Sequence, residues 1–362
     1  MIHYSTYFDD NYVVRAIAML ASLRRHSAPF TLWCLSLTPE CEAILKRLAL
    51  PEIRIVPLRE LEAADADLVA TKSGRTRAEY FFTITPCWCR HLLSRHPEID
   101  LLTYLDSDLI FYANPAPLFQ ELGSASIGII EHRTTRPRVL ERKFGRFNVG
   151  WVSFRNDATA EACVADWRRD CLEWCFDHVE PGRYADQKYL DRWPERHAGL
   201  KILTHPGANV APWNVARHDV RLSNGRLTSD AMPLIFYHFH GLRNRRNGLV
   251  DLALAQYKVP LSTRRWLRQH LYRPYLMALH EHSSRVNPGH DISRVLQTAR
   301  QDEGTSPSLA YVVGAEIASK TVTVWAPLHR WWMDWSGSGI TGGWPSARID
   351  DPAVADVPLP PS

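Results

Sequence analysis

The chain has 362 residues, which is enough for one large α/β domain with an appendage. Its 45% hydrophobic and 23% charged residues are typical of a soluble globular protein. The net charge of +4 is small for this length and no recognisable nucleic-acid-binding motif accompanies it, so we do not expect a nucleic-acid partner.

The seven cysteines are odd in number and form no pair of C-x-x-C clusters. They are Cys34, Cys41, Cys87, Cys89, Cys163, Cys171 and Cys175. This pattern favours reduced thiols in a cytoplasmic protein over a disulfide framework or a zinc site. The first ten residues lack the basic start and long apolar core of a signal peptide, and no run of about 18 apolar residues predicts a membrane span.

The first part of the chain alternates between strand and helix patterns. Residues 2–8 predict a strand, and residues 11–26 predict a helix with apolar side chains at helical spacing and a basic last turn. A strand (30–37), a helix opened by a proline (39–48) and a third strand (53–57) follow. This order predicts an α/β protein with a doubly wound, mostly parallel sheet and helices on both faces.

Two aspartates follow the next strong strand pattern, residues 101–105. Asp106-Ser107-Asp108 comes where a buried strand should leave the sheet, at the edge where ligands bind in open α/β sheets. Two carboxylates there are costly unless they hold a metal or a partner, and oxygen ligands suit Mg²⁺ or Mn²⁺. The alternative is a strand-to-turn junction in which these residues only supply turn chemistry.

The periodicity predicts further elements on either side of this motif. They are a polar helix and loop (59–74), helices at 77–95 and 115–122, strands at 126–130 and 147–154, helices at 158–178 and 184–193, and a strand at 234–240 as the last of the sheet. Residues 132–146 form a basic segment between two of the strands.

The character of the chain changes after Gly248. Residues 249–300 form a basic helical extension, which either docks on the main domain with a solvated basic face or contacts anionic lipid. Residues 301–362 are rich in Gly, Ser, Pro and Asp, with an aromatic island at 325–335, and we expect them to be poorly structured. The predicted domains are therefore 1–248, 249–300 and 301–362.

Glycine is absent from the first 73 residues. The chain therefore has no G-x-G-x-x-G after its first strand and no P-loop, which disfavours a dinucleotide-dependent dehydrogenase, a P-loop kinase and a sugar-phosphate nucleotidyltransferase. Another segment must hold a nucleotide if one binds. Asp9-Asp10-Asn11-Tyr12, between the first strand and helix, either caps that helix or grips a base and ribose.

As an ordered set, five segments resemble motifs of GT-A glycosyltransferases, most closely glycosyltransferase family 8 and related bacterial nucleotide-sugar transferases. They are Phe8 to Tyr12, Tyr104 to Asp108 (the D-x-D motif), Phe147 to Gly150, Asp186-Gln187 and His238 to Gly241. The resemblance covers roughly residues 2–248 and implies a GT-A fold with a nucleotide-sugar donor, most often a UDP-sugar, and a bound Mn²⁺ or Mg²⁺.

The resemblance also implies roles for individual residues. Asp106, Asp108 and a late histidine would hold the metal; His238 fits the spacing, but His240 points to the same side of a strand, so both stay open. Residues implied in donor binding are Asp9, Asp10, Asn11, Tyr12, Asp106, Ser107, Asn148, Gly241 and Arg243. An arginine upstream of the metal motif would also touch the donor, with Arg90 fitting the family's separation best and Arg77 second. Asp186 and Gln187 would lie at the reaction centre, with retention of anomeric configuration.

One departure from the family is visible. Asn244 stands where the closest members have a phosphate-binding lysine, and Arg243 or Arg245 is the available cation. Purely structural roles remain open for single motifs: Asn148 can be a strand-end cap, and Asp186-Gln187 can be the first turn of a helix. For the whole chain the alternatives to a glycosyltransferase are a metal-dependent phosphoester hydrolase and a non-catalytic binding module. The acceptor is unidentified: a glycan, a lipid-linked glycan, a protein or a small molecule.

Overall fold

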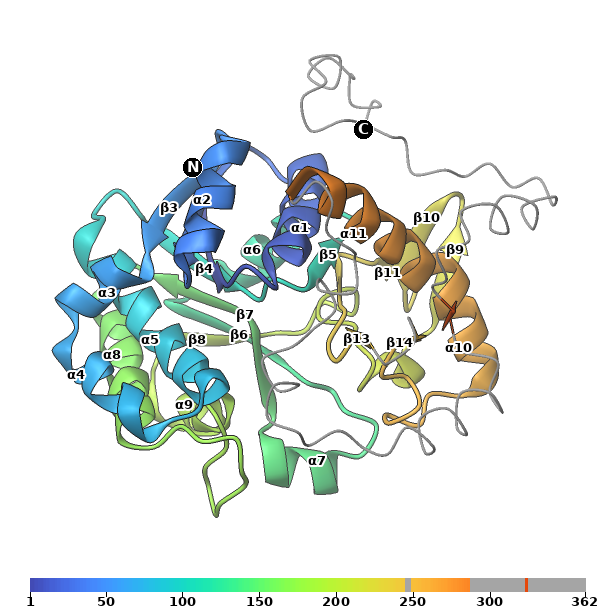
Figure 1. Cartoon of the computed structure of the whole chain (residues 1–362). Coiled ribbons are helices and arrows are strands. Elements are labelled where there is room, and N and C mark those ends of the chain that lie inside the picture. Colours follow the sequence, from blue (N-terminus) through green and yellow to red (C-terminus); the bar gives the residue numbers. More distant parts are fainter. Residues whose placement is uncertain (245–248, 287–322, 325–362) are drawn as a thin grey trace. The chain divides into compact units, whose positions relative to one another are not determined.

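The central sheet of this computed structural model has seven strands in the order β3-β2-β1-β4-β7-β6-β8 (Figure 1). The structure describes residues 1–244, 249–286 and 323–324. The strands are β1 (Ile2–Phe8), β2 (Phe30–Ser36), β3 (Ile53–Pro57), β4 (Leu101–Leu105), β6 (Ile127–Glu131), β7 (Phe147–Arg155) and β8 (Leu200–Leu203). Four of the six strand pairs are parallel, and β7 runs antiparallel to both β4 and β6. The predicted fold class, a mostly parallel mixed sheet flanked by helices, is confirmed; β8 was not predicted.

Helices flank this sheet. They are α1 (Val13–His26), α2 (Pro39–Leu48), α3 (Leu58–Ala64), α4 (Ala66–Thr71), α5 (Arg77–Arg95), α6 (Ala116–Leu122), α7 (Pro137–Phe144), α8 (Ala158–Glu173), α9 (Trp193–Arg196), α10 (Leu261–Leu267) and α11 (Arg273–Val286). Short 3-10 helices are η1 (Lys72–Gly74), η2 (Gln187–Arg192) and η3 (Val215–Arg217), and η5 (Arg268–Tyr272) is a π-helical turn. α5 packs against α8, and α11 packs against α1.

Local chemistry explains the helix starts that the sequence predicted well. The Thr38 hydroxyl accepts a hydrogen bond from the backbone N–H of Cys41 at the start of α2, with Pro39 at the first helical position. Thr76 and Glu79 form a reciprocal capping box that opens α5. Such side-chain caps are readable from sequence because donor and acceptor lie within three residues of each other.

Two predicted helices were wrong in extent or type. The helix predicted at 158–178 ends at Glu173, because Trp174 takes an extended backbone conformation. The helix predicted at 184–193 is instead the 3-10 helix η2, followed by the short α9. At the first place the apolar pattern continued past the point where the backbone leaves the helix; at the second the chain is helical but tighter.

The strand predicted at 234–240 is shorter and is not part of the main sheet. β12 (Phe236–His238) pairs antiparallel with β5 (Leu109–Phe111) in a separate two-stranded sheet, with His238 opposite Leu109. The remaining strands form two small sheets: β9 (Val220–Ser223), β10 (Arg226–Ser229) and β11 (Met232–Pro233) make one, and β13 (Arg243–Asn244), β14 (Leu249–Asp251) and β15 (Thr323–Val324) make the other.

The described residues all belong to one compact unit, which extends to Val324. The predicted boundary after residue 248 stays a prediction, and the predicted tail lies outside the described residues apart from β15. All seven cysteines are buried and free, as predicted for reduced thiols. None of the described helices is long and apolar enough to cross a membrane.

Trp151 joins the two-stranded sheet to the main sheet. It lies on β7, is 1% exposed, and stacks on Phe236 of β12 with ring centroids 5.6 Å apart. Its ring also packs against Phe111 of β5, 6.4 Å away, and against Tyr4 of β1, 6.2 Å away. One side chain thus fixes β5 and β12 on the sheet.

Replacing Trp151 by alanine should therefore destabilise the fold. We expect Trp151→Ala to lower the free energy of unfolding by about 3–5 kcal/mol, since it leaves a large cavity beside the rings of Phe236, Phe111 and Tyr4. Urea denaturation measures this, with Leu222→Ala as a control at a side chain that is 50% exposed. A loss below about 1 kcal/mol for Trp151→Ala would show that the two sheets are held together elsewhere.

Candidate functional site

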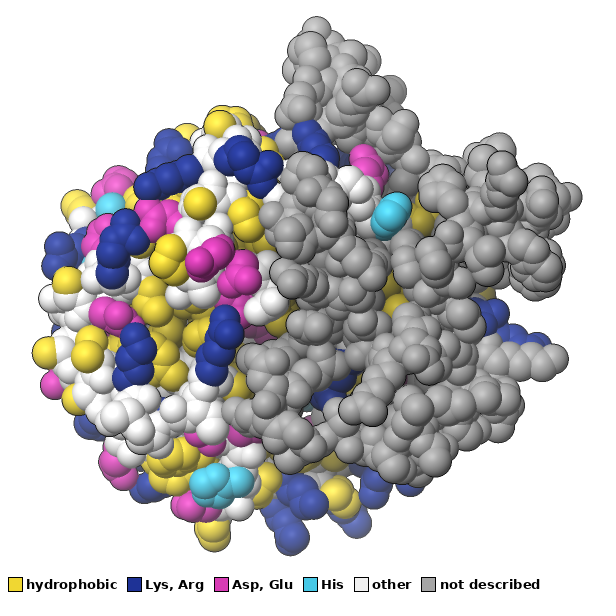
Figure 2. Space-filling model, viewed as in Figure 1, with side chains coloured by type: hydrophobic (Ala, Val, Ile, Leu, Met, Phe, Trp, Pro, Cys, Tyr) yellow, Lys and Arg dark blue, Asp and Glu magenta, His cyan; other side chains and the backbone are white. Residues whose placement is uncertain are grey.

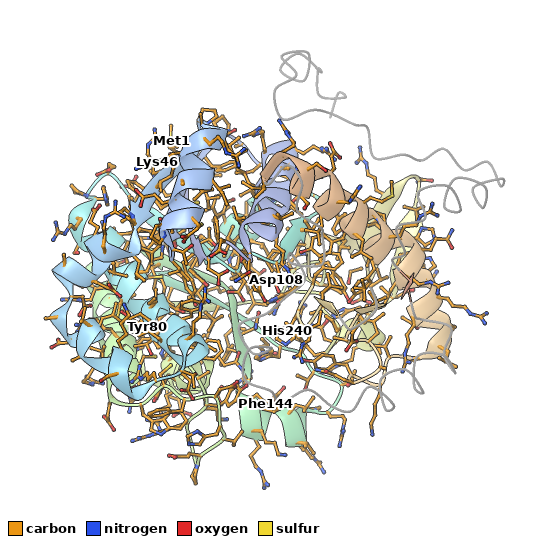
Figure 3. All side chains as sticks on the ribbon, viewed as in Figure 1. Met1, Lys46, Tyr80, Asp108, Phe144 and His240 are labelled. Atoms are coloured by element: carbon orange, nitrogen blue, oxygen red, sulfur yellow. The ribbon has the colours of Figure 1, made fainter. Side chains whose placement is uncertain are left out.

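A cavity of about 610 Å³ lies where strands β1 and β4 end. The two strands are parallel neighbours, so the residues that follow Phe8 and Leu105 meet at one edge of the sheet. Most of the predicted site residues line it: Asp9, Tyr12, Asp106, Ser107, Asp108, Asn148, Asp186, Gln187, His238, His240, Gly241 and Arg243. Figure 3 labels Asp108, His240 and Phe144 of its wall.

Asp9 fixes the turn between β1 and α1. Its Oδ1 accepts hydrogen bonds from the backbone N–H groups of Asn11 (3.0 Å) and Tyr12 (3.1 Å), and Arg77 donates to its Oδ2 at 2.6 Å. Burial raises the pKa of Asp9, while Arg77 opposes that shift. The Asp9 carboxylate is thus already engaged in hydrogen bonds within the protein. Asp9 and Tyr12 are the residues of this turn that line the cavity.

Four of the predicted donor-binding residues do not line the cavity. Asp10 accepts a hydrogen bond from the Thr38 hydroxyl at 3.0 Å, and the Asn11 amide lies 3.4 Å from Asp9. Arg77 reaches Asp9 from the first turn of α5, whereas Arg90 is exposed on a later turn of that helix. Neither arginine lines the cavity, which α5 reaches only through its early residues, so a donor contact by either stays a prediction.

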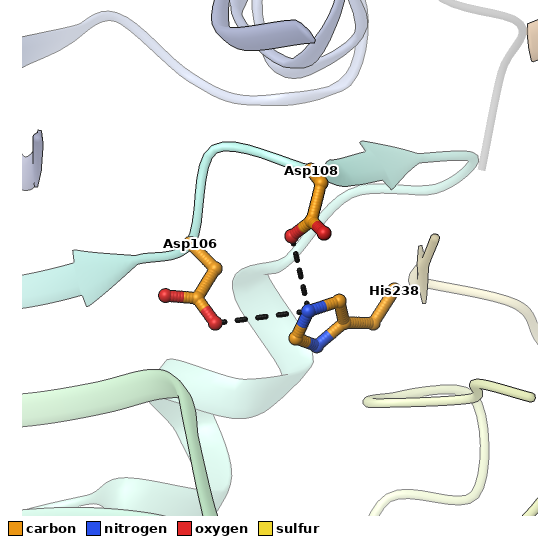
Figure 4. A group of neighbouring side chains, drawn as sticks. All are labelled: Asp106, Asp108 and His238. Atoms are coloured by element: carbon orange, nitrogen blue, oxygen red, sulfur yellow. Dashed lines mark ion pairs between the residues drawn. The ribbon is translucent and has the colours of Figure 1, made fainter. Parts of the chain in front are cut away.

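Asp106, Asp108 and His238 converge at the centre of the cavity (Figure 4). The Nε2 atom of His238 is 3.0 Å from Asp108 Oδ1 and 3.7 Å from Asp106 Oδ2, and one potential ligand atom from each residue lies within 4.8 Å of the others. Within residues 1–244, 249–286 and 323–324, this is the one such group of three. The two carboxylates sit on the link between β4 and β5, and the β5–β12 pairing delivers the histidine.

His240 does not join this group. Its ring centroid is 5.8 Å from that of His238, and both rings pack edge-on against Trp213, at 5.3 and 5.0 Å. Of the two histidines left open by the sequence, His238 is the one that lies with Asp106 and Asp108. Trp213 lines the cavity, and its Nε1 donates to the carbonyl of His132 at 2.9 Å.

The three groups perturb one another strongly. Burial raises the pKa of Asp106, with His238 opposing and Asp108 adding to the rise. Burial also acts to raise the pKa of Asp108, but the charge and hydrogen bond of His238 outweigh it and hold that pKa below its usual range. Two carboxylates and an imidazole at this separation match the oxygen and nitrogen ligands of a divalent ion such as Mn²⁺ or Mg²⁺.

Arg15 is a buried charged residue next to Tyr12 of the site, and the sequence interpretation missed it. It lies on α1, is 1% exposed, and donates to the carbonyl of Leu242 at 2.9 Å while its guanidinium covers the Tyr12 ring at 4.6 Å. Its charge helps to hold down the pKa of Asp108. A signal was available in the sequence, because Arg15 is the one charged residue in the otherwise apolar run Val13 to Leu20, all of which is buried.

Gly150 allows β7 to pass next to the cluster. A Cβ atom at this position would lie 2.7 Å from Asn148 Oδ1 and 2.9 Å from His238 Nδ1. Both side chains are buried and cannot move aside easily. The Asn148 oxygen already accepts a hydrogen bond from the Gly150 N–H at 3.1 Å, so Asn148 shapes this strand and lines the cavity as well.

Asp186 and Gln187 line the cavity at the start of η2. Asp186 is buried, accepts a hydrogen bond from the Thr85 hydroxyl at 2.9 Å, and its backbone carbonyl accepts one from Trp167 at 2.8 Å. Burial, with a smaller contribution from the charge of Asp106, raises the pKa of Asp186 to about 7. The Gln187 amide donates to the carbonyl of Phe144 at the end of α7, 2.7 Å away.

Comparison with known proteins gives a family. No model of a known protein family matches the chain. The chain is 34% identical to "Uncharacterized protein YfnD" of Bacillus subtilis (strain 168) over 243 residues, which cover 66% of this chain and 77% of the relative. It belongs to the family of YfnD. "Uncharacterized protein YfnF" of the same organism is 32% identical over 248 residues, covering 66% of this chain and 81% of that relative.

A solved structure supports the fold of this YfnD family member. It is the galactosyltransferase LgtC in complex with donor and acceptor sugar analogs, with a TM-score of 0.51 and 15% identity over 77% of this chain and 96% of that one. The predicted GT-A architecture is therefore confirmed, while membership of glycosyltransferase family 8 in particular stays a prediction.

Adding one methyl group at Gly150 should disturb the cluster of Asp106, Asp108 and His238 without changing any of these three side chains. We expect Gly150→Ala to weaken Mn²⁺ binding, measured by calorimetry, at least tenfold, which corresponds to about 1.4 kcal/mol. Gly74→Ala is the control, since a Cβ there meets no atom within 4 Å. Unchanged Mn²⁺ affinity in Gly150→Ala would mean that His238 does not hold the ion.

The raised pKa of Asp186 predicts a pH-dependent stability. Its folded pKa of about 7 lies above the unfolded value near 3.9, so the native state binds the proton more tightly and loses stability as the pH rises through this window. Relative to Asp186→Asn, the native chain should lose up to about 1.4 kcal/mol per pH unit between roughly pH 4 and 7. Chemical denaturation across that range measures it; parallel curves for the two proteins would show that Asp186 is charged throughout.

Proposed function

We propose that this protein is a metal-dependent glycosyltransferase. It transfers a hexose from a nucleotide diphosphate sugar, most simply a UDP-sugar, to an acceptor. The observation that carries the proposal is the Asp106, Asp108 and His238 cluster at the carboxyl end of β4, inside a cavity of donor size. The GT-A fold supports it, because LgtC, a galactosyltransferase solved with donor and acceptor sugar analogs, has this fold.

The residues at the cluster fit a divalent ion. Asp106 and Asp108 offer carboxylate oxygens and His238 an imidazole nitrogen, which leaves further coordination positions for donor diphosphate oxygens. When bound, Mn²⁺ or Mg²⁺ would neutralise the negative charge that builds up on the departing diphosphate. The protein holds these ligands rigidly: Tyr104 donates to Asp106 Oδ1 at 3.0 Å, and the Asp106 N–H donates to the Gly150 carbonyl at 3.2 Å.

The β1 turn is the proposed nucleoside site. Tyr12 and Asp9 line the cavity next to the cluster, and Arg77 orients Asp9 from α5. Asp10 and Asn11 complete the turn through their own hydrogen bonds. The base and ribose would then lie beside Tyr12, with the diphosphate directed to Asp108.

The diphosphate has its own proposed contacts. Gly241 adopts a left-handed backbone (φ +76°) and brings the chain close to the cavity, and Arg243 and Ser107 line it nearby. Arg243 would replace the lysine that the resembling family carries one residue later, as Arg can bind a phosphate through two hydrogen bonds. Arg245, the second candidate, lies outside the described residues.

The donor sugar would lie between the cluster and η2. Asn148, Asp186 and Gln187 line this part of the cavity. The Gln187 amide nitrogen is bound to Phe144, which fixes the side chain and leaves its oxygen for the sugar face opposite the leaving group. This placement supports a retaining reaction in which the leaving phosphate accepts the acceptor's proton and no separate general base is needed.

Two other functions fit less well. Phosphoester hydrolases often use two metal ions and more converging ligands, and among the described residues the cluster has three ligands only. A binding module without catalysis would not require Asp186 and Gln187 to face the donor sugar. Cytoplasmic location and peripheral membrane contact through the basic extension stay predictions.

Removing one carboxylate of the cluster tests the proposal. We expect Asp106→Ala to weaken Mn²⁺-dependent UDP binding at least a hundredfold in calorimetry, about 2.7 kcal/mol, because the ion loses a ligand and the diphosphate loses the ion. Asp100→Ala is the matched control, since Asp100 is exposed just before β4, away from the cavity-lining residues.

The competing functions separate in the same assay series. Unchanged Mn²⁺-dependent UDP affinity in Asp106→Ala would contradict the proposal. Turnover of simple phosphoesters, with UDP-sugar cleavage independent of any acceptor, would favour the hydrolase. UDP-sugar binding with neither transfer nor slow donor hydrolysis would favour the binding module.

A further inference from the structure

The wall of the cavity is divided by charge. Its aspartates, Asp9, Asp106, Asp108 and Asp186, follow β1 and β4 or precede η2. Its lysine and arginines lie on other segments: Arg136 before α7, Arg243 on β13 and Lys258 before α10. In the proposed function, the aspartates serve the donor through the metal ion. The basic residues of the wall have no role in that proposal except Arg243.

Arg136 is held at the rim of the cavity by a helix that is itself hardly buried. α7 begins directly after it and has no buried residue, although Leu140 and Phe144 line the cavity. Figure 2 shows Lys and Arg side chains gathered at the edge of the molecule where α7 lies. No carboxylate in the described part of the chain pairs with Arg136.

Lys258 faces the same cavity from a strained turn. Its backbone is left-handed (φ +56°), which is uncommon for a residue other than glycine, and its N–H donates to the carbonyl of Ala255 at 3.0 Å. The side chain is exposed, and within residues 1–244 and 249–286 it has no acidic partner. A strained backbone that places a free cation in a cavity is a feature of binding sites.

Trp213 brings these two cations to one wall. Its carbonyl accepts a hydrogen bond from the N–H of Thr135, next to Arg136, at 3.3 Å. Its ring lies 6.4 Å from that of Tyr257, next to Lys258, and 5.3 Å from His240. The two basic segments therefore flank the same tryptophan, beside the histidine that the metal cluster does not use.

A polar group and an aromatic surface complete this wall. The Thr134 hydroxyl is buried and has no hydrogen-bond partner among the described residues, although Thr134 lines the cavity. A buried hydroxyl without a protein partner is costly, and a ligand group that reached the Thr134 hydroxyl would satisfy it. Phe144 and Tyr184 pack edge to face at 4.9 Å and offer an apolar surface to a sugar ring.

We propose that Thr134, Arg136 and Lys258 form the acceptor subsite and that the acceptor is an anionic sugar, carrying a carboxylate or a phosphate. The inference rests on the proposed glycosyltransferase function and names its acceptor class. A donor diphosphate does not require these cations, because the metal ion would offset the carboxylates of the cluster. Arg15 and Arg243 are the cations next to the proposed nucleoside site, since their charges act on Tyr12.

Paired sugars that differ only in charge test this subsite. In calorimetry with UDP and Mn²⁺ present, we expect methyl β-D-glucuronide or methyl β-D-glucoside 6-phosphate to bind the native protein at least tenfold more tightly than methyl β-D-glucoside. The two anionic sugars distinguish a carboxylate from a phosphate. The double variant Arg136→Gln/Lys258→Gln should bind all three within about twofold.

A matched control and a donor control accompany the test. Arg138→Gln changes an exposed arginine of α7 that does not line the cavity, and it should keep the tenfold preference. The affinity for UDP with Mn²⁺ should be the same in the native protein and the double variant.

Three results would overturn the inference: equal binding of charged and neutral sugars, no binding of either anionic sugar, or weaker UDP binding in the double variant, which would assign the cations to the donor. Failure of the native protein to bind UDP with Mn²⁺ would overturn the proposed glycosyltransferase function as well.

Discussion

The contact between Asp108 and His238 is the interaction on which the site depends. The two residues are 130 positions apart, and the antiparallel pairing of β5 with β12 places their side chains 3.0 Å apart. Trp151 stacks on Phe236 and holds this small sheet against the large one, while Gly150 leaves room for the imidazole. Fold stability and ligand geometry thus share the same few residues of β7 and β12.

Burying two carboxylates, an imidazole and the guanidinium of Arg15 around one point is expensive unless their charges are matched. The protein matches them in part by itself, since His238 and Arg15 both favour the charged form of Asp108. The charged form of Asp106 remains unfavourable, since burial raises its pKa. A bound divalent ion would stabilise that charged form, and a substrate diphosphate would supply further ligands to the ion. The aspartates of the cavity would then be matched by the ion, and Arg136 and Lys258 remain for the proposed acceptor.

The sequence predicted the elements whose signals are local. The strands β1 to β4 and the helices α2 and α5 lie where apolar periodicity and caps put them, and Asp106-Ser107-Asp108 is at the predicted sheet edge. The features it missed depend on tertiary contacts. β12 pairs with β5 and not with the main sheet, and β8 is the edge strand next to β6. Arg15 is buried on a helix. Arg90 was preferred by spacing, yet the direction of α5 carries it away from the cavity.

The central claim is that Asp106, Asp108 and His238 hold one divalent ion against a nucleotide diphosphate. Anomalous diffraction at the manganese edge, from crystals grown with UDP and Mn²⁺, tests it most directly. The account predicts one manganese peak in coordination distance of all three side chains, about 2.0–2.3 Å, with oxygens of the UDP diphosphate as further ligands. UDP bound in the cavity with no peak between these residues, or a peak bound only by other residues, would contradict it.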